Sequence, residues 1–285
     1  MPELPEVETI VRYLDKNISG KKITDVLVLS KKQFPQDPKL IIGAKILSVS
    51  RRGKNTIIIL SNDKVMIVHL RMTGQLILMN GNEDKYETKQ QIPLSGGSEL
   101  PGRSTRVIIN LNSGKLFFNE SRKFGAIRII SGAEADKEAD KLGPEPFGKD
   151  FSIDYLTRIF KRTRKPIKAL LLDQEKIAGI GNIYASEILF EAKINPKRPA
   201  KNLNQQEIKA LYCATLFILE EAINYGGSSA SDEAYIQPDI SRGLYQDHSR
   251  VYQRDGQPCK KCKALIKRII VGGRGTFYCP VCQNN

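Results

Sequence analysis

The chain has 285 residues and 40% hydrophobic content, which is enough to bury a core in two domains. Lys and Arg (45) outnumber Asp and Glu (31), and the formal charge of +14 favours a polyanionic partner, nucleic acid before an anionic membrane surface. No apolar run approaches the roughly 20 residues that a helix needs to span a bilayer, so we expect no membrane-spanning helix. Five cysteines, four of them in the last 27 residues, do not resemble an extracellular disulfide framework and favour a reducing, cytosolic compartment.

The chain begins with Met1, Pro2 and Glu3, and removal of Met1 would give Pro2 a free secondary amine beside a carboxylate. An α-amino group has a reference pKa of roughly 7.7–8.0, so a sizeable fraction is neutral and nucleophilic at pH 7. Its attack on an aldehyde carbon gives an iminium, which acts as an electron sink. An ordinary helix start, with prolines in the first turn and acids near the positive end of the dipole, accounts for the same residues. On these residues alone the ordinary helix start is favoured, and the rest of the chain must decide.

The next segment has apolar residues that step by three and four, which predicts an amphipathic helix: Val7, Val11, Leu14 and Ile18. Ser19-Gly20 ends it. Short Ile- and Val-rich segments separated by turn residues then predict a β-sandwich or barrel, with strands at 22–30, 44–51, 55–60, 64–71, 75–79, 106–111, 115–119 and 126–130. Residues 80–105 are polar and contain Gly and Pro, so we expect a long surface loop there.

A helical period returns after residue 150, in the segments 153–163, 166–173, 183–191 and 205–225. A glycine turn, Gly179-Ile180-Gly181, opens the third of these helices, and backbone N–H groups at such a turn suit an anion. Cys213 lies on the longest helix, where we expect a small core residue. The expected organisation is a β-sandwich domain over 1–135, an acidic linker over 136–150, a helical domain over 151–248 and a metal-binding segment over 249–285.

The most specific spacing in the chain is Cys259-x2-Cys262-x16-Cys279-x2-Cys282. Two Cys-x-x-Cys knuckles separated by a short hairpin place four thiolates tetrahedrally around Zn²⁺. Four protein ligands leave no open coordination position, so we expect one structural zinc and no chemistry at it; a pair of disulfides is the weaker alternative. Arg274 lies in a glycine-containing loop between the knuckles, from which it could reach a phosphate.

Several motifs together resemble the formamidopyrimidine-DNA glycosylases. They include the opening Pro-Glu-Leu-Pro-Glu-Val-Glu-Thr and the closing Arg-Gly-Thr-Phe-Tyr-Cys-Pro-Val-Cys-Gln, and between these Arg-Arg-Gly-Lys, His-Leu-Arg-Met-Thr-Gly, Ser-Arg-Lys-Phe-Gly and Gly-Asn-Ile-Tyr-Ala-Ser-Glu. The resemblance covers both ends and the middle of the chain, in the order of the family. It implies an α+β protein, with an N-terminal helix and β-sandwich followed by a helix–two-turn–helix domain carrying a four-cysteine zinc finger.

The activity that the resemblance implies is a bifunctional DNA glycosylase and abasic-site lyase that removes oxidised purines, 8-oxoguanine and formamidopyrimidines, and cuts the strand by β,δ-elimination. It implies a monomer that acts on damaged duplex DNA in the cytoplasm, at the nucleoid. Pro2 would be the nucleophile at the sugar C1′ and Glu3 the general acid and base. Lys54 would contact phosphate and the active site, as would Arg274, and Lys168 would touch the backbone or base on the lesion side.

The resemblance implies DNA contacts at six positions: His69, Met72, Arg122, Phe124, Lys168 and Asn182. His69 and Asn182, together with Arg274, resemble clamps on the backbone of a kinked strand. Met72, Arg122 and Phe124 match a trio that fills the void left by a flipped base: an apolar wedge, a guanidinium for the orphaned partner base and a stacking ring. Purely structural roles are the alternatives at four of these positions: a structural histidine at 69, a helix-surface lysine at 168, a core methionine at 72 and a hairpin phenylalanine at 124.

Two departures from the family pattern concern loops. The segment 228–235 is acidic and lacks the arginine expected where a loop caps a flipped purine, which affects lesion preference. Residues 80–105 are longer than the pattern needs. Two other functions stay open at this point: a non-catalytic zinc-finger DNA-binding protein, which would have no use for Pro2 and Glu3, and a glycosylase for oxidised pyrimidines.

Overall fold

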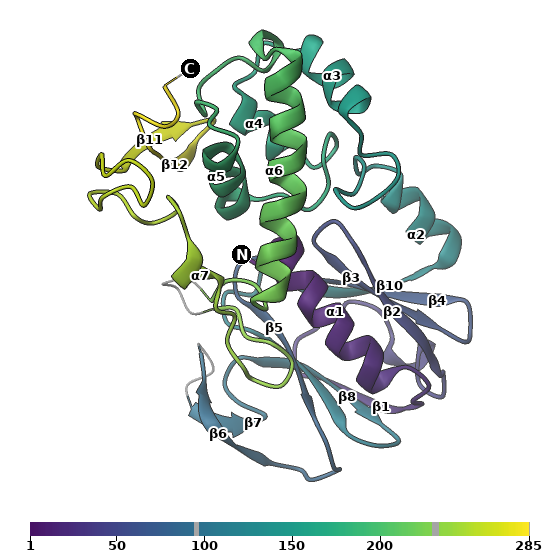
Figure 1. Ribbon diagram of the computed structural model, residues 1–285. Helices are drawn as coiled ribbons and strands as arrows, with labels where there is room; N and C mark the ends of the chain where they lie inside the picture. The colour runs from purple at the N-terminus through teal and green to yellow at the C-terminus, as the bar shows by residue number, and fades with distance from the viewer. Residues whose placement is uncertain (94–96, 230–233, 285) are drawn as a thin grey trace. The chain divides into compact units, whose positions relative to one another are not determined.

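The computed structural model describes residues 1–93, 97–229 and 234–284, and the chain divides into two compact units (Figure 1). Unit 1 comprises Met1–Asp140 with Tyr225–Gln246, and unit 2 comprises Lys141–Asn224 with Asp247–Asn285. None of the helices in the described part of the chain combines the length and apolar character that a bilayer crossing requires.

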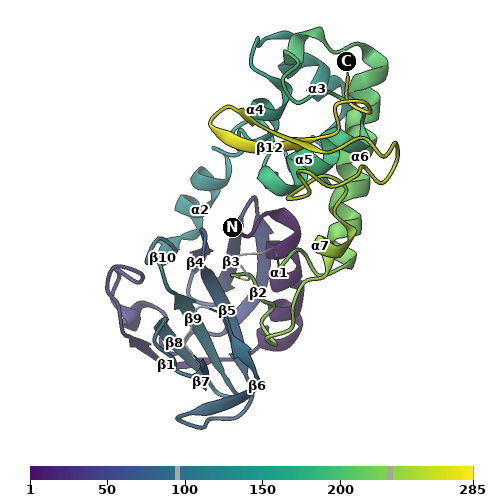
Figure 2. The same ribbon diagram turned by 90° about the vertical axis from the view of Figure 1, so that its left-hand side faces the viewer.

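Unit 1 is a β-sandwich that begins with helix α1 (Leu4–Ile18), whose apolar face enters the sandwich core. One sheet has the strand order β1-β8-β9-β5 and the other β10-β4-β3-β2, and all neighbouring strands in them are antiparallel. Figure 2 shows the two sheets from the side. The strands are β1 (Ile23–Val28), β2 (Ile46–Arg52), β3 (Asn55–Leu60), β4 (Lys64–His69), β5 (Gly74–Met79), β8 (Thr105–Leu111), β9 (Lys115–Glu120) and β10 (Ala126–Ser131).

The strand register places three segments that carry candidate site residues at the same end of one sheet. His69, the last residue of β4, pairs with Asn55 of β3 on one side and with Ala126 of β10 on the other. The turn before Asn55 carries Lys54, and the loop before Ala126 carries Arg122 and Phe124. Register alone therefore brings residues that are far apart in sequence to one rim of the sandwich.

The expected loop over 80–105 is irregular at both ends, but its middle is not a loop, because β6 (Tyr86–Ile92) and β7 (Gly97–Leu100) form an antiparallel pair of strands. Tyr86, Ile92 and Leu100 are buried in a second apolar cluster with side chains of β5, β8 and β9. Three widely spaced apolar residues in a polar segment give little periodic signal. Tertiary packing onto the outer face of a sheet decides the structure instead.

Unit 2 is helical and carries a small hairpin. Its longest helix, α6 (Gln205–Asn224), packs against α5 (Asn182–Glu191) and α3 (Ile153–Lys161). α5 is buried on nearly all sides, and its buried residues include the polar Ser186 and Glu187 as well as apolar ones. The other elements are α4 (Ile167–Leu171), the 3-10 turn η2 (Ala200–Asn202), and the hairpin strands β11 (Lys267–Val271) and β12 (Arg274–Tyr278).

Three further details differ from the sequence-based expectation. A helix, α2 (Gly132–Ala139), which is capped by Ser131 and Glu134, runs from the end of the expected sandwich domain into the expected linker. Residues Tyr225–Gln246, expected in the helical domain, belong to unit 1, where Tyr235 enters the sandwich core. Cys213 is exposed, because it lies on the face of α6 opposite its buried stripe. The overall fold class, an α+β protein with helix, sandwich, helical domain and four-cysteine segment, is confirmed.

Candidate active site and nucleic-acid interface

Pro2 and Glu3 lie buried at the start of α1, while Met1 is 37% exposed. Glu3 is the residue before the first helical turn, and its backbone N–H donates to Glu6 Oε2 at 2.7 Å. The other oxygen, Glu6 Oε1, accepts from the backbone N–H of Ser228 at 2.8 Å. Glu6 thus fixes Glu3 and a loop of unit 1 at once. The sequence reasoning missed it, although the Glu-x-x-Glu capping spacing was a signal.

The loop that meets Glu6 is closely fitted to it. Gly227 has φ +78°, and a Cβ there would lie 2.9 Å from Glu6 Cγ and Oε1, so only glycine fits. The Tyr235 hydroxyl donates to the carbonyl of Gly226 at 3.0 Å. Burial, with the nearby charge of Glu6, raises the pKa of Tyr235 well above its ordinary value, so the phenol stays neutral. Residues 230–233 of the atypical segment 228–235 lie outside the described residues.

Lys54 is positioned by an ion pair on α1. Arg51 Nε lies 2.8 Å from Glu8 Oε2, and Arg51 Nη1 donates to the carbonyl of Gly53 at 3.0 Å. Burial alone would raise the pKa of Glu8, but hydrogen bonds and charges from Arg51 and Arg12 outweigh it, and the net pKa is lowered. An ionised Glu8 therefore holds the Gly53-Lys54 turn to the helix that carries Pro2.

His69 is held as a neutral ring at the end of β4. Its Nδ1 accepts from the backbone N–H of Arg71 at 3.1 Å. Burial, then the positive charges of Arg71, Lys54 and Arg128, lowers its pKa from 6.5 to about 4. A neutral imidazole with Nδ1 as acceptor carries its proton on Nε2, which is the donor a phosphate contact needs.

Met72 and Phe124 are exposed apolar tips on neighbouring loops of unit 1. Met72 is 38% exposed and Phe124 58% exposed. The guanidinium of Arg122 lies 5.3 Å from the centre of the Phe124 ring. The alternatives of a core Met and a packed hairpin Phe do not hold, because neither side chain is buried.

Three predicted residues of unit 2 meet around the turn between β11 and β12. Asn182 Nδ2 donates to the carbonyl of Gly275 at 3.0 Å. Lys168 Nζ donates to that carbonyl at 3.2 Å, to Thr276 Oγ1 at 2.9 Å and to Ser186 Oγ at 3.1 Å. Arg274 comes directly before Gly275 and Thr276 in the chain and is exposed. The contacts tie the Arg274 turn to the start of α5.

Lys168 differs from both readings of the sequence. Its side chain is 0% exposed, so it is neither a helix-surface charge nor available at the surface of unit 2 for a DNA contact. Lysine is almost never fully buried unless its ammonium is satisfied, and here hydroxyl and carbonyl oxygens satisfy it. Lys168 therefore holds Gly275 and Thr276, the two residues that follow Arg274, in place.

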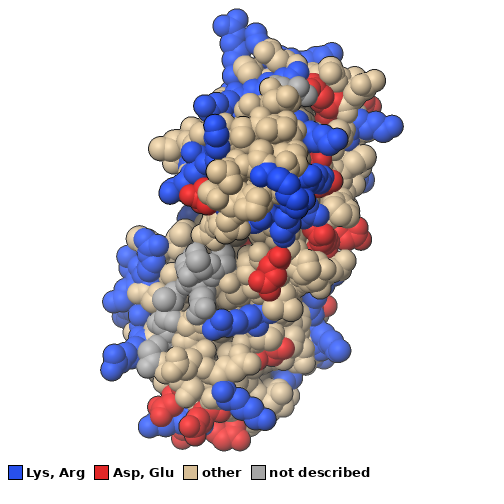
Figure 3. All heavy atoms as spheres, turned by 60° about the vertical axis from the view of Figure 1, so that its left-hand side comes forward, with Lys and Arg blue, Asp and Glu red and all other residues tan. Residues whose placement is uncertain are grey.

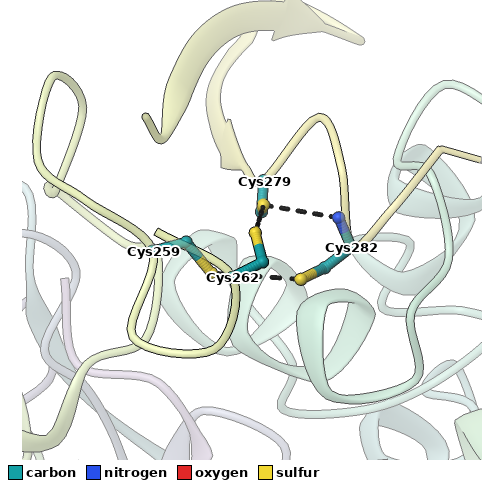
Figure 4. A group of neighbouring side chains, drawn as sticks. All are labelled: Cys259, Cys262, Cys279 and Cys282. Atoms are coloured by element: carbon teal, nitrogen blue, oxygen red, sulfur yellow. Dashed lines mark hydrogen bonds between the residues drawn. The ribbon is translucent and has the colours of Figure 1, made fainter. Parts of the chain in front are cut away.

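The four cysteines of unit 2 converge on one point (Figure 4). Their Sγ atoms all lie within 4.8 Å of one another, with Cys262 and Cys279 at 3.4 Å and Cys259 and Cys282 at 4.0 Å. A tetrahedral Zn²⁺ with Zn–S of about 2.3 Å has sulfur atoms about 3.8 Å apart, and a disulfide only about 2.05 Å. The donor set fits zinc and does not fit a disulfide pair.

Lys and Arg side chains form larger patches than Asp and Glu in the view of Figure 3, in keeping with the basic excess of the sequence. Two exposed basic sets belong to unit 2. One lies in the last turn of α3 and directly after it: Arg158, Lys161, Arg162, Arg164 and Lys165. The other surrounds the cysteines: Lys260, Lys261, Lys263, Lys267, Arg268 and Arg274. Such sets provide a sequence-independent attraction to phosphate.

Comparison with known proteins agrees with this geometry. Residues 1–127 match the model of the formamidopyrimidine-DNA glycosylase N-terminal domain, 142–234 the helix–two-turn–helix domain of the same enzymes, and 256–285 a zinc finger found in these enzymes and in isoleucyl-tRNA synthetases. A formamidopyrimidine-DNA glycosylase of Pelotomaculum thermopropionicum is 40% identical, over 99% of both chains. The chain belongs to the formamidopyrimidine-DNA glycosylase family.

Solved structures of the formamidopyrimidine-DNA glycosylase family superpose over the whole chain. The enzyme of Thermus thermophilus has a TM-score of 0.86 at 36% identity and covers 100% of this chain and 99% of its own. A Lactococcus lactis variant, determined with DNA containing a formamidopyrimidine lesion, has 0.87 at 34% identity with 100% of both chains covered. Members of the family are DNA glycosylases with abasic-site lyase activity, and this protein is accordingly a base-excision repair enzyme with a zinc finger.

Proposed function

We propose that this protein excises oxidised purines, 8-oxoguanine and formamidopyrimidines, from duplex DNA through a Schiff base on Pro2. The observation that carries the proposal is the buried Pro2-Glu3 pair, whose backbone Glu6 fixes at 2.7 Å on a rigid helix. A terminal nucleophile needs this immobility, because chain ends otherwise fray. The Lactococcus lactis relatives, determined with formamidopyrimidine and abasic-site DNA, support the same substrate class.

The reaction begins after Met1 is removed, since a retained methionine turns the Pro2 nitrogen into an amide. The Pro2 lone pair forms a bond to C1′ as the bond from C1′ to the base breaks, and Glu3 supplies a proton to the sugar ring or leaving base. Ring opening and loss of the amine proton give the iminium. Removal of a C2′ proton then expels the 3′ phosphate, and a second elimination expels the 5′ phosphate.

The other residues hold DNA during these steps. Lys54 contacts phosphate beside the reacting sugar, and His69, Asn182 and Arg274 clamp the backbone. Met72, Arg122 and Phe124 occupy the space of the flipped base. The segment 228–235 is acidic and lacks the arginine of the family pattern. Relatives that carry this arginine therefore do not predict the order of preference of this chain among oxidised purines.

One zinc ion, held by Cys259, Cys262, Cys279 and Cys282, would stabilise the hairpin that presents Arg274. The ion supplies folding energy and takes no part in bond breaking, since all four positions are filled by protein. We further propose a monomer that works on chromosomal DNA in the cytoplasm, where four closely spaced thiols stay reduced.

Borohydride trapping on a duplex with a single 8-oxoguanine tests the proposal. Wild-type protein should form a covalent adduct, and Pro2→Gly should form far less. An absence of adduct with wild type, or an undiminished one with Pro2→Gly, would favour a non-catalytic DNA-binding protein. A second substrate class belongs in the same panel, because another Lactococcus lactis relative was determined with DNA containing an oxidised pyrimidine. Faster trapping on that substrate would indicate a pyrimidine-lesion enzyme.

A further inference from the structure

A buried carboxylate joins the two loops that carry the exposed tips Met72 and Phe124. Glu120 is the last residue of β9, is 0% exposed, and pairs across the sheet with Gly74 of β5. The turn carrying Met72 lies just before Gly74, and the loop carrying Arg122 and Phe124 starts just after Glu120. The residue therefore lies at the junction of the two loops.

Both oxygens of Glu120 accept hydrogen bonds from these loops. Oε1 accepts from the Thr73 hydroxyl, in a short contact, and from the backbone N–H of Arg122 at 3.0 Å. Oε2 accepts from the backbone N–H of Gly125 at 2.7 Å. Arg122 N–H also lies 3.3 Å from Thr73 Oγ1, so the two loops touch each other directly. Hydrogen bonds to a carboxylate are about twice as strong as those between neutral groups.

The loop that carries Arg122 and Phe124 packs closely against the Glu120 carboxylate. A Cβ on Gly125 would lie 2.7 Å from Glu120 Oε2 and 2.9 Å from the carbonyl oxygen of His69, so no other residue fits there. Lys123, at φ +59°, turns the chain, and its carbonyl accepts from Gln33 Nε2 at 3.0 Å. Backbone contacts fix the base of the loop on both sides while Arg122 and Phe124 remain exposed.

We propose that Glu120 is a positioning residue that locks the Met72 turn and the Arg122–Phe124 loop into one rigid wedge. The inference rests on the proposed function, in which these three side chains fill the void left by the flipped base. Inserting flexible loops into a base stack would cost ordering entropy at the moment of binding. A carboxylate that orders both loops beforehand removes that cost, so wedge insertion becomes a single event and not two independent ones.

The test compares two kinds of DNA. A duplex holding a tetrahydrofuran abasic-site analogue opposite 2-aminopurine requires the wedge, and binding and fluorescence report its insertion. A single-stranded oligonucleotide with a natural abasic site has no partner base to displace, and borohydride trapping on it reports Pro2 chemistry alone. The variants are Glu120→Gln, which puts an NH₂ against an N–H donor; Thr73→Val, which removes one donor; and Thr73→Ser, which restores it.

Glu120→Gln should weaken duplex binding and the fluorescence change by about tenfold, and trap single-stranded DNA at the wild-type rate. Thr73→Val should show the same pattern to a smaller degree, and Thr73→Ser should recover. Asp15→Asn is the matched control, because Asp15 Oδ1 also accepts a backbone N–H in unit 1, from Val49 at 2.7 Å, but touches neither loop.

Wild-type duplex binding by folded Glu120→Gln and Thr73→Val proteins would overturn the proposal, as would equal losses on both DNAs. Thr73→Val against Thr73→Ser decides the matter if Glu120→Gln does not fold. Failure of wild type to trap either DNA would instead contradict the Pro2 mechanism. The duplex-binding comparison would then still decide the role of Glu120.

Discussion

Glu6 Oε2 accepts a hydrogen bond from the backbone N–H of Glu3 at 2.7 Å. Glu6 is only 1% exposed, and its second oxygen is used by Ser228, 222 residues later in the chain. The N-terminal end of α1, where we propose the active site, is therefore fixed from two directions by one carboxylate. This explains how a chain terminus can be rigid enough for chemistry.

Glu6→Gln should slow Schiff-base formation by about tenfold, because one carboxylate oxygen becomes an NH₂ that faces an N–H donor. Duplex affinity should change much less, since the DNA-contacting side chains are elsewhere. Single-turnover trapping measures the first quantity and equilibrium binding the second. The matched control is Glu134→Gln, which removes the same type of capping carboxylate from α2, where Glu134 Oε2 accepts from Ser131 N–H at 2.8 Å. Equal rates for Glu6→Gln and wild type would contradict this role.

Lys168→Met should lower duplex affinity by about tenfold while the zinc content stays at one ion per chain. The substitution removes the ammonium that holds Gly275 and Thr276, so the turn carrying Arg274 loosens. Lys165→Met is the control, because it removes an equal charge from an exposed side chain whose ion pair with Asp173 contributes little. Equal losses in the two variants, measured by binding titration, would indicate a simple charge effect.

Stability should depend on His69 between pH 4 and 6.5. Its folded-state pKa of about 4 is below the ordinary 6.5, so in this window the unfolded chain binds a proton that the folded protein does not. Stability is therefore lost as pH falls from 6.5 to 4, by at most about 3 kcal/mol, and is unaffected above 6.5. Urea unfolding of wild type and His69→Asn across pH 4–7.5 measures the difference. An identical pH slope in the two proteins would show that His69 does not titrate this way.

Chelation of zinc should abolish DNA binding before the β-sandwich of unit 1 unfolds. The four cysteines belong to unit 2, and their cluster includes Phe190, Val251, Ile266 and Phe277 of that unit. Metal loss removes folding energy from this part alone. Hydrogen exchange of the strands of unit 1 during chelator titration provides the readout. Simultaneous loss of protection in both units would mean that they do not fold separately.

Local patterns predicted those elements whose cause is local. The three-and-four spacing from Val7 to Ile18 predicted α1, and short Ile- and Val-rich segments between turn residues predicted the sandwich strands. The cysteine spacing predicted the metal cluster. The exposed positions of Met72 and Phe124 also agree with their predicted place in loops between strands.

The parts that sequence could not supply depend on distant partners. Three features require a neighbour that no local sequence period reveals: the hydrogen bond from Ser228 to Glu6, the burial of Lys168, and the packing of β6 and β7. Cys213 shows the same limit on a single helix. Cysteine is usually buried, which favoured a core position. The buried face of α6 contains Leu211 and Ile218, however, and Cys213 lies on the opposite, exposed face.

Mass mapping of the borohydride-trapped adduct tests the central claim most directly. The protein is trapped on a duplex with one 8-oxoguanine, digested, and the peptide bearing the sugar remnant is sequenced by tandem mass spectrometry. We expect a chain that begins at Pro2, without Met1, with the remnant on the Pro2 nitrogen. A remnant on a lysine such as Lys54, or an active protein that retains Met1, would contradict it.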